Sequence, residues 1–207
     1  MLEIDNWEVH NLERSLLASK NSFSIGKINT MPIDEDLGPT VGDLERGERL
    51  GSTPMGSGHD GFLSGILVTF DIKYPEYWSP EFQRYHWAQI IMSQSKMHKL
   101  TSMGKDYENF KLMFNEYVDI SIIDRIHELI IIYNNLPEEI IAATKHKYFM
   151  KIISNLPMGF EKWMTVTTNY LQLKTIYNQR KNHKLKEWHV FCNWCLKLPY
   201  FKDFIGV

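Results

Sequence analysis

The stretch Phe62–Lys73, which reads FLSGILVTFDIK, decides the fold class of this chain. It is rich in β-branched and aromatic residues, and from Leu67 onward apolar and polar residues alternate. Alternation with a period of two places one face of a strand against a core and the other toward solvent. We therefore expect a strand here, and we expect it to end at Pro75 because proline cannot donate a ladder hydrogen bond.

The sequence before this strand predicts a strand, a helix and then a long loop. Trp7–His10 is expected to be a short strand, and Leu12–Leu17 carries leucines spaced for one buried helical face. Glycine and proline interrupt residues 28–56, which predicts a long loop insertion with a short acidic helix at Val41–Leu50. A loop of this length is usually functional or mobile.

Helical spacing of apolar residues dominates the rest of the chain. The helices that this spacing predicts cover residues 79–92, 119–134, 137–154, 165–182 and 185–198. Strands are thus expected only in the first half. This arrangement favours an α+β fold with a small sheet and a helix-rich C-terminal half, formed by a single domain over residues 1–207.

The composition excludes several classes of protein. The 207 residues carry 23 Lys and Arg against 25 Asp and Glu, so the chain is neither a broadly basic nucleic-acid binder nor a disordered acidic tail. No apolar run approaches the roughly 18 residues of a membrane span, and the N-terminus lacks the features of a signal peptide. We therefore expect a soluble, cytoplasmic protein with no membrane partner.

Two common catalytic signatures are missing from the sequence. Cys192 and Cys195 form a C-x-x-C pair, but it lies inside a predicted helix without a second such pair, so we interpret both as small packed residues. The 8 histidines show no H-E-x-x-H spacing, and there is no nucleophile elbow. Zinc hydrolysis and serine hydrolase chemistry are therefore not expected, and no metal site is predicted.

A glycine-rich segment, GSGHDG at Gly56–Gly61, leads into the strand. Its backbone could approach a ligand closely and offer N–H groups to phosphate oxygens, with His59 beside them. The pattern is neither a P-loop nor a dinucleotide fingerprint. An ordinary turn before a strand is the alternative interpretation.

A second group of polar residues follows the strand. Its members are Arg84, His86, Ser93, Ser95, Lys96 and His98. Arg84 and Lys96 could hold a phosphate or carboxylate, the two serine hydroxyls could donate to a ring carbonyl, and His98 could move a proton. The alternative is that the two cations are solvated charges on a helix face and that His86 fills a gap in the core.

A third group lies near the C-terminus. The window Lys174–Lys186 contains five basic residues and no acidic one, so it is locally positive although the chain is not. Tyr177 and Trp188 add aromatic faces that could stack on a base or a flavin ring. The window could therefore recognise phosphate, or it could be an exposed helix junction with solubilising charge.

Several short segments, taken in order, carry a resemblance. In the N-terminal part they are Trp7-Glu8-Val9, Ala18, Ser22-Phe23, Gly58-His59 and Val68–Lys73 with Pro75. In the C-terminal part they are Leu156-Pro157, Thr167, Asn169, Leu173, Arg180 and Trp188. With this spacing the chain resembles the flavin-dependent thymidylate synthase family, in a divergent form similar to small proteins of phages and prophages. The resemblance covers most of the chain except residues 28–55.

The chain departs from the family at its signature, R-H-R-x-x-S-x-N-E-x-S-x-R-Y. One register places Arg84 on the first arginine and Lys96 on the last. A register shifted by one residue keeps His86 and Ser95 but places Met97 on the last arginine. Both registers lack the asparagine-glutamate pair and most of the arginine charge.

The resemblance implies an activity and a set of site residues. Members of the family transfer a methylene carbon from folate to deoxyuridylate, reduced flavin supplies hydride, and the nucleotide site lies between subunits of a homotetramer. For FAD the resemblance implies contacts by His59, Arg84, His86, Asn169 and His183. For a dUMP-like nucleotide it implies contacts by Arg180, Lys96 and Ser93, with Ser95 and His98 in catalytic roles.

Two functions of different class follow from the resemblance. The first is a phage-type enzyme in which ordinary methylation of dUMP is weakened, because each missing charge-assisted contact is worth about 1.5–3 kcal/mol. The second is a non-catalytic nucleotide-binding protein, or a phage accessory protein that inhibits a host protein, on the same fold. Nucleic acid is not an expected partner. In both cases Arg180→Ala is expected to remove nucleotide affinity with little loss of stability.

Overall fold

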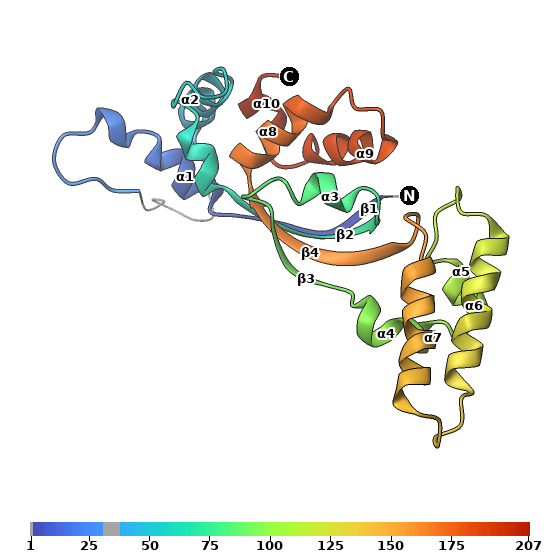
Figure 1. The fold of residues 1–207 in the computed structure, drawn as a ribbon. Coiled ribbons are helices and arrows are strands. Elements are labelled where there is room, and N and C mark those ends of the chain that lie inside the picture. Colours follow the sequence, from blue (N-terminus) through green and yellow to red (C-terminus); the bar gives the residue numbers. More distant parts are fainter. Residues whose placement is uncertain (1, 31–37) are drawn as a thin grey trace. The chain divides into compact units, whose positions relative to one another are not determined.

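The structure is a computed structural model that describes residues 2–30 and 38–207, except for the side chains of His98 and Met103 (Figure 1). Its contacts divide the chain into two compact units, which are described separately. Unit 1 comprises Met1–Glu3, Lys73–Phe82 and Met92–Met164, and unit 2 comprises Ile4–Ile72, Gln83–Ile91 and Thr165–Val207. That residues 1–207 form a single domain stays a prediction.

The described strands form one four-stranded sheet with the order β1-β2-β4-β3. Their bounds are β1 Glu3–His10, β2 Leu67–Pro75, β3 Gln89–Ser93 and β4 Glu161–Asn169. The Thr69 and Thr167 hydroxyls lie 3.1 Å apart, and the Thr165 hydroxyl donates to Asp71 at 2.6 Å, so β2 and β4 run antiparallel. The strand expected over Phe62–Lys73 is confirmed from Leu67 onward, but its first part is wrong, because Gly61–Gly65 forms a 3₁₀ helix.

Helices account for most of the remaining described chain. Their bounds are α1 Leu12–Ala18, α2 Val41–Gly51, α3 Ser79–Phe82, α4 Lys96–Met103, α5 Tyr107–Lys111, α6 Ile120–Asn134, α7 Ala142–Asn155, α8 Tyr170–Arg180, α9 Lys186–Cys195 and α10 Phe201–Ile205. Short 3₁₀ helices occupy Asn21–Phe23 and Gly61–Gly65. The α+β class with a small sheet and a helix-rich C-terminal half is confirmed. No described helix is long and apolar enough to cross a membrane.

Unit 2 has an aromatic core. Alternate residues of β2, Val68, Phe70 and Ile72, are fully buried, as the period of two predicts. The Phe70 ring lies 4.6 Å from the ring of Trp194 on α9, and α8 and α9 lie side by side (Figure 1). Cys195 is fully buried in the same helix.

The two cysteines are confirmed as small packed residues. Both are buried free thiols. Burial raises the pKa of the Cys192 thiol to about 11 and raises the pKa of Cys195 as well. Neither thiol therefore has the low pKa of a reactive cysteine.

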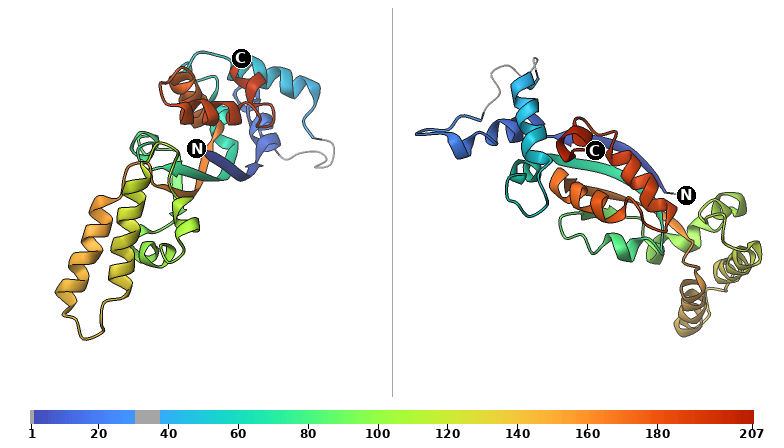
Figure 2. Two further views of the ribbon diagram at one scale, coloured as in Figure 1. Left: turned by 90° about the vertical axis from the view of Figure 1, so that its right-hand side faces the viewer. Right: turned by 90° about the horizontal axis from the view of Figure 1, so that it is seen from above.

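Unit 1 contains a helical hairpin in which α6 and α7 run antiparallel (Figure 2). Its buried apolar core consists of Leu100, Phe110, Phe114, Ile123, Ile126, Leu129, Ile130, Ile152 and Phe160. The helix expected over 119–134 is confirmed. The next helix begins at Ala142 rather than at Pro137, because residues 137–141 form the turn between the two helices.

The helix expected over residues 79–92 is wrong. α3 ends at Phe82 after a single turn, and the chain then forms the strand β3. The adjacent β-branched Ile90 and Ile91 favour extended backbone. This segment forms a strand and not a helix because it pairs with β4, which is distant in sequence.

The helix expected over residues 165–182 is also wrong in its first part, and strands are not confined to the first half. The run Thr165-Val166-Thr167-Thr168 is β-branched throughout and belongs to β4. Met164, Val166 and Thr168 are buried with the period of a strand. Helix α8 begins only after Asn169, whose side-chain oxygen accepts a hydrogen bond from the Gln172 N–H at its N-terminus.

The glycine-rich segment 28–56 contains the expected acidic helix, α2, and its residues 31–37 lie outside the described part of the chain. Thr40 caps α2 by accepting from the Asp43 N–H. The Asp43 carboxylate accepts from Lys20 at 2.6 Å and from Arg46 at 2.7 Å. Burial alone would raise the pKa of Asp43, but the hydrogen bonds from Lys20, Thr40 and Arg46 hold it far below its usual range.

Asp43→Asn is expected to lower the free energy of unfolding by about 1–3 kcal/mol, because two cations lose their carboxylate. A carboxyl with a depressed folded-state pKa stabilises the fold above its unfolded pKa, near 3.9, and loses this contribution as the pH falls below it. The contribution is lost completely only below the depressed folded-state pKa, so urea unfolding should show the full difference between variant and parent at pH 7 and a smaller difference at pH 3. Glu45→Gln on the exposed face of α2 is the matched control and should show no such difference.

Candidate functional site

A hollow of about 230 Å³ lies beside His59 in unit 2. It is lined by Ala18, Ser19, Ser22, Phe23, Leu50, Gly58, His59, Gly61 and Phe62. Gly58 has a φ of +79°, a backbone conformation that favours glycine, and a Cβ at Gly58 or Gly61 would meet only open space. The glycine-rich segment therefore forms one wall of this hollow. An ordinary turn before a strand does not need to line such a space.

Two polar groups on this wall are available to a ligand. Among the described residues, neither the Ser22 hydroxyl nor the His59 ring has a hydrogen-bond partner. The Ser19 hydroxyl is different, because it donates to the Leu16 carbonyl and accepts from Arg46 Nε at 2.8 Å. Phe23 is 81% exposed, so its ring is open to stacking.

A buried ion pair holds the glycine-rich segment against α8. Lys174 Nζ donates to Asp60 Oδ2 at 2.6 Å, and the two side chains are 3% and 6% exposed. The same ammonium donates to the carbonyls of Gly51 and Thr53 at 2.8 and 2.7 Å. All three ammonium protons are thus used, as a buried charge requires. The pair fixes the residue next to His59.

Arg180, at the end of α8, is held by aromatic side chains. Its Nε donates to the Tyr85 hydroxyl at 2.7 Å, and its guanidinium carbon lies 4.7 Å above the ring of Trp188. The Tyr85 hydroxyl in turn donates to Gln179 Oε1 at 3.1 Å. The sequence alone predicted that Arg180 contacts a ligand and has little structural role. The structure shows that Arg180 also packs against Tyr85 and Trp188.

Asn169 is connected to the turn that carries Arg84 and His86. Its Oδ1 accepts from the Gln172 N–H at 2.8 Å, and Gln172 Oε1 accepts from the Trp87 N–H at 3.3 Å. Arg84 and His86 are exposed on this turn. Asn169 thus caps its helix with one oxygen and positions the turn through Gln172.

His183 lies just after α8. Its Nδ1 accepts from the Leu185 N–H at 3.2 Å, and its ring lies 6.3 Å from the ring of Trp188. Arg180 and His183 therefore share Trp188 as a neighbour. In unit 2 the structure brings Arg180, His183, Asn169 and the turn at Arg84 into one network around α8, and it connects His59 to α8 through Asp60.

The other candidate residues belong to unit 1. Lys96 Nζ and Lys162 Nζ each lie 3.1 Å from the same oxygen of Glu76, so one carboxylate neutralises both cations. Burial alone would lower the pKa of Lys162, but Tyr74 and Glu76 raise it overall. Lys96 is therefore less available to a phosphate than the sequence alone suggests.

The remaining unit 1 candidates lie along β3 and α4. Ser93 is exposed at the end of β3, and Ser95 is half-buried before α4. The side chain of His98, in α4, lies outside the described part of the structure. Gln94 pairs with β4: its N–H donates to the Trp163 carbonyl at 2.9 Å, and its Oε1 accepts from the Trp163 N–H at 3.1 Å.

Sequence reasoning missed the structural roles of several residues that build this site, and it counted Lys174 in the positive window although Lys174 is buried and paired with Asp60. These residues are Asp60, Tyr85, Gln172, Lys174 and Glu76. Only the role of Lys174 could have been predicted from the sequence, because this charged residue lies on the apolar side of a helix. The others pair with partners far away in sequence.

Comparison with solved structures identifies the fold of the chain. No protein-family model matches the chain, and no curated protein matches it. Among solved structures it is similar to flavin-dependent thymidylate synthase ThyX from Helicobacter pylori complexed with FAD and dUMP, with a TM-score of 0.67 and 16% identity over 99% of this chain and 96% of that chain. A second structure, Thymidylate Synthase X from Helicobacter pylori with FAD and dUMP, gives a TM-score of 0.68 and 15% identity over 99% and 97%. The chain therefore has the fold of flavin-dependent thymidylate synthases.

The residues around His59 fit part of a flavin cofactor. The glycine wall leaves open space, Phe23 offers an exposed ring, and Ser22 and His59 offer polar atoms without protein partners in the described chain. Drug-sized ligands usually occupy roughly 300–1,000 Å³. A hollow of about 230 Å³ therefore has room for one ring system of such a cofactor and not for the whole of it.

Proposed function

We propose that the protein binds FAD and a pyrimidine deoxynucleotide, and that it is a phage-type relative of the flavin-dependent thymidylate synthases. The observation that carries this proposal is the fold likeness over 99% of the chain to enzymes whose structures hold FAD and dUMP. The hollow beside His59 supports it, because its open glycine wall and unpartnered polar atoms suit a planar ring.

In this proposal the FAD contacts come from unit 2. His59 and Ser22 hydrogen bond to a ring edge, and Phe23 stacks on its face. Arg84 and His86 on the exposed turn, Asn169 and His183 complete the contacts with the cofactor. Bound flavin supplies the hydride. The chain's own residues bind the cofactor, orient it and shield it from water.

The proposed nucleotide contacts come from both units, which are considered separately. Arg180 of unit 2 is a proposed phosphate contact, and Lys96 and Ser93 of unit 1 are proposed phosphate contacts as well. Ser95 and His98 keep the catalytic roles that the resemblance implies. Arg180 is suited to a phosphate contact because stacking on Trp188 and the bond from its Nε to Tyr85 fix the plane of the guanidinium. Folate as the carbon donor and a homotetramer as the assembly belong to the same proposal. Cytoplasmic residence stays a prediction.

A non-catalytic protein on the same fold is the second candidate, and one observation favours it. Glu76 neutralises both Lys96 and Lys162, which leaves less positive charge for the phosphates of two ligands. Such a protein would capture a nucleotide or inhibit a host protein without turnover.

Incubation with FAD, methylene-folate, dithionite as reductant and dUMP separates the two candidates. The enzyme proposal predicts a nucleotide product in which a methyl group replaces one hydrogen of the base, a net gain of one CH₂ in mass. The non-catalytic candidate predicts that dUMP raises the melting temperature, since ligands that bind only the folded state stabilise it, while no product forms. Absence of both product and stabilisation would contradict nucleotide binding altogether.

A further inference from the structure

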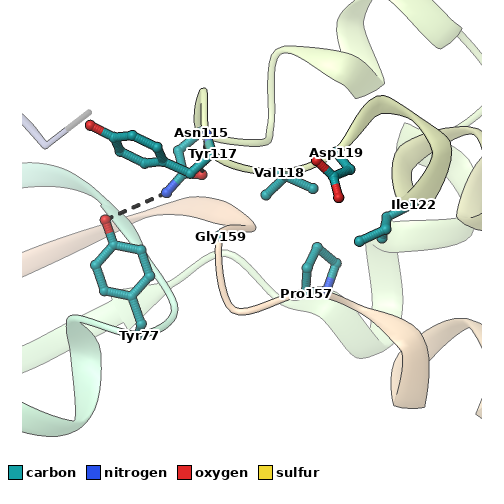
Figure 3. A pocket seen from close by; sticks show the side chains of 8 residues that line it. All are labelled: Tyr77, Asn115, Tyr117, Val118, Asp119, Ile122, Pro157 and Gly159. Atoms are coloured by element: carbon teal, nitrogen blue, oxygen red, sulfur yellow. Dashed lines mark hydrogen bonds between the residues drawn. The ribbon is translucent and has the colours of Figure 1, made fainter.

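A second hollow, of about 240 Å³, lies in unit 1 (Figure 3). It is lined by Tyr77, Asn115, Tyr117, Val118, Asp119, Ile122, Pro157 and Gly159. Three segments meet there: the turn after β2, the loop between α5 and α6, and the loop between α7 and β4. None of these residues belongs to the FAD or nucleotide site proposed above.

Backbone hydrogen bonds fix the three segments to one another. The Tyr77 N–H donates to the Met158 carbonyl, and the Asn115 N–H donates to the Gly159 carbonyl, both at 3.0 Å. A Cβ at Gly159 would stand 2.4 Å from Val118 and 2.7 Å from Asn115 Oδ1, so only glycine allows this close approach. The hollow is therefore preformed.

Buried Asn115 positions the two tyrosines. Its Oδ1 accepts from the Tyr117 N–H at 3.2 Å, and its Nδ2 donates to the Tyr77 hydroxyl at 3.4 Å (Figure 3). Asn115 is only 8% exposed. Asn115 thus holds the Tyr77 hydroxyl and the backbone of Tyr117 at one end of the hollow, and the Tyr117 ring is exposed there.

Asp119 is an exposed residue that stands at the other end, where its carboxylate is open to a ligand. It is the N-cap residue of α6, yet its side chain accepts no capping hydrogen bond. Capping is the usual role of aspartate at this position. Figure 3 shows the carboxylate directed into the hollow, between Val118 and Ile122. Among the described residues no ion pair or hydrogen bond reaches it.

The lining therefore has one negative charge, two phenol rings and apolar side chains, and it contains no Lys, Arg or His. An ammonium group is attracted to the Asp119 carboxylate, while an alkyl chain suits the apolar wall of Val118, Ile122 and Pro157 and the phenol rings at the other end. A volume of about 240 Å³ corresponds to roughly eight waters, which suits a molecule of a few carbons. We propose that this hollow binds a small alkylammonium ion.

Calorimetric titration of the full chain with n-butylammonium, n-butanol and n-butyrate at constant ionic strength tests the proposal. We expect saturable binding of the ammonium and at least tenfold weaker binding of the other two. Asp119→Asn should weaken butylammonium binding about tenfold. Glu116→Gln, an exposed acid three residues away that does not line the hollow, is the matched control and should leave binding unchanged.

Tyr117→Ala provides a second, independent test because the Tyr117 side chain is 68% exposed and its removal should leave the fold intact. It should weaken butylammonium binding several-fold. Equal binding of butanol and butylammonium would show a merely apolar depression and would overturn the proposal. Unchanged affinity in Asp119→Asn, or no saturation by the ammonium, would overturn it as well. None of these outcomes bears on FAD or dUMP.

Discussion

Lys174→Met is expected to lower the free energy of unfolding by about 3–5 kcal/mol, the largest effect of any single substitution considered for this chain. Lys174 and Asp60 are buried and joined at 2.6 Å, and the ammonium also satisfies the carbonyls of Gly51 and Thr53. Removing the ammonium leaves a carboxylate and two carbonyls buried without a donor. Urea-induced unfolding measured by circular dichroism gives the change.

A double variant keeps this prediction testable if the single one fails to fold. Asp60→Leu with Lys174→Met replaces both charges by apolar groups, which often costs little, so most of the lost stability should return. Lys184→Met, an exposed basic residue just after α8, is the control and should change stability by less than about 0.5 kcal/mol. A loss in Lys174→Met no larger than in Lys184→Met would contradict the role of the buried pair.

Arg180→Ala is expected to have the second largest effect, on both ligand affinity and stability. If Arg180 holds the nucleotide phosphate, losing a charge-assisted contact of about 1.5–3 kcal/mol weakens dUMP binding roughly ten- to hundredfold. The variant also loses the bond to Tyr85 and the stacking on Trp188, so stability should fall by about 1–2 kcal/mol. The sequence alone led us to expect little loss of stability. Titration calorimetry with dUMP and urea unfolding measure the two quantities.

Arg125→Ala is the matched control for this experiment. Arg125 is an exposed arginine of α6 that pairs with Glu128, so its removal should change neither dUMP affinity nor stability appreciably. A stability loss in Arg180→Ala with unchanged dUMP affinity would assign Arg180 a purely structural role and remove it from the nucleotide site.

Local sequence patterns predicted the helices and strands whose burial is visible in the spacing of their own residues. The alternation after Leu67 is visible because every second residue of β2 is buried in one core, and the helical spacing in Ile120–Asn134 reflects one face packed in unit 1. β3 and β4 were missed because their pairing is non-local, and because Ile91 also fits a helical pattern of apolar spacing.

Some residues of the candidate site could be predicted from the sequence, and others could not. His59, Asn169 and Arg180 could be selected from the sequence because short motifs carry them. The residues that hold them could not, since Asp60 and Lys174 are 114 positions apart and Tyr85 and Arg180 are 95 positions apart. Only the folded chain reveals that the apparent surface lysine Lys174 is buried and that Tyr85, in the turn after α3, supports Arg180.

The absorption spectrum of the purified protein, followed by titration with FAD, tests flavin binding most directly. The proposal predicts the visible bands of bound flavin, or their appearance on titration, together with a rise in melting temperature. His59→Ala should weaken this binding, and His146→Ala, an exposed histidine of α7, should not. A colourless protein that gains neither flavin absorbance nor thermal stability from added FAD would contradict the proposal.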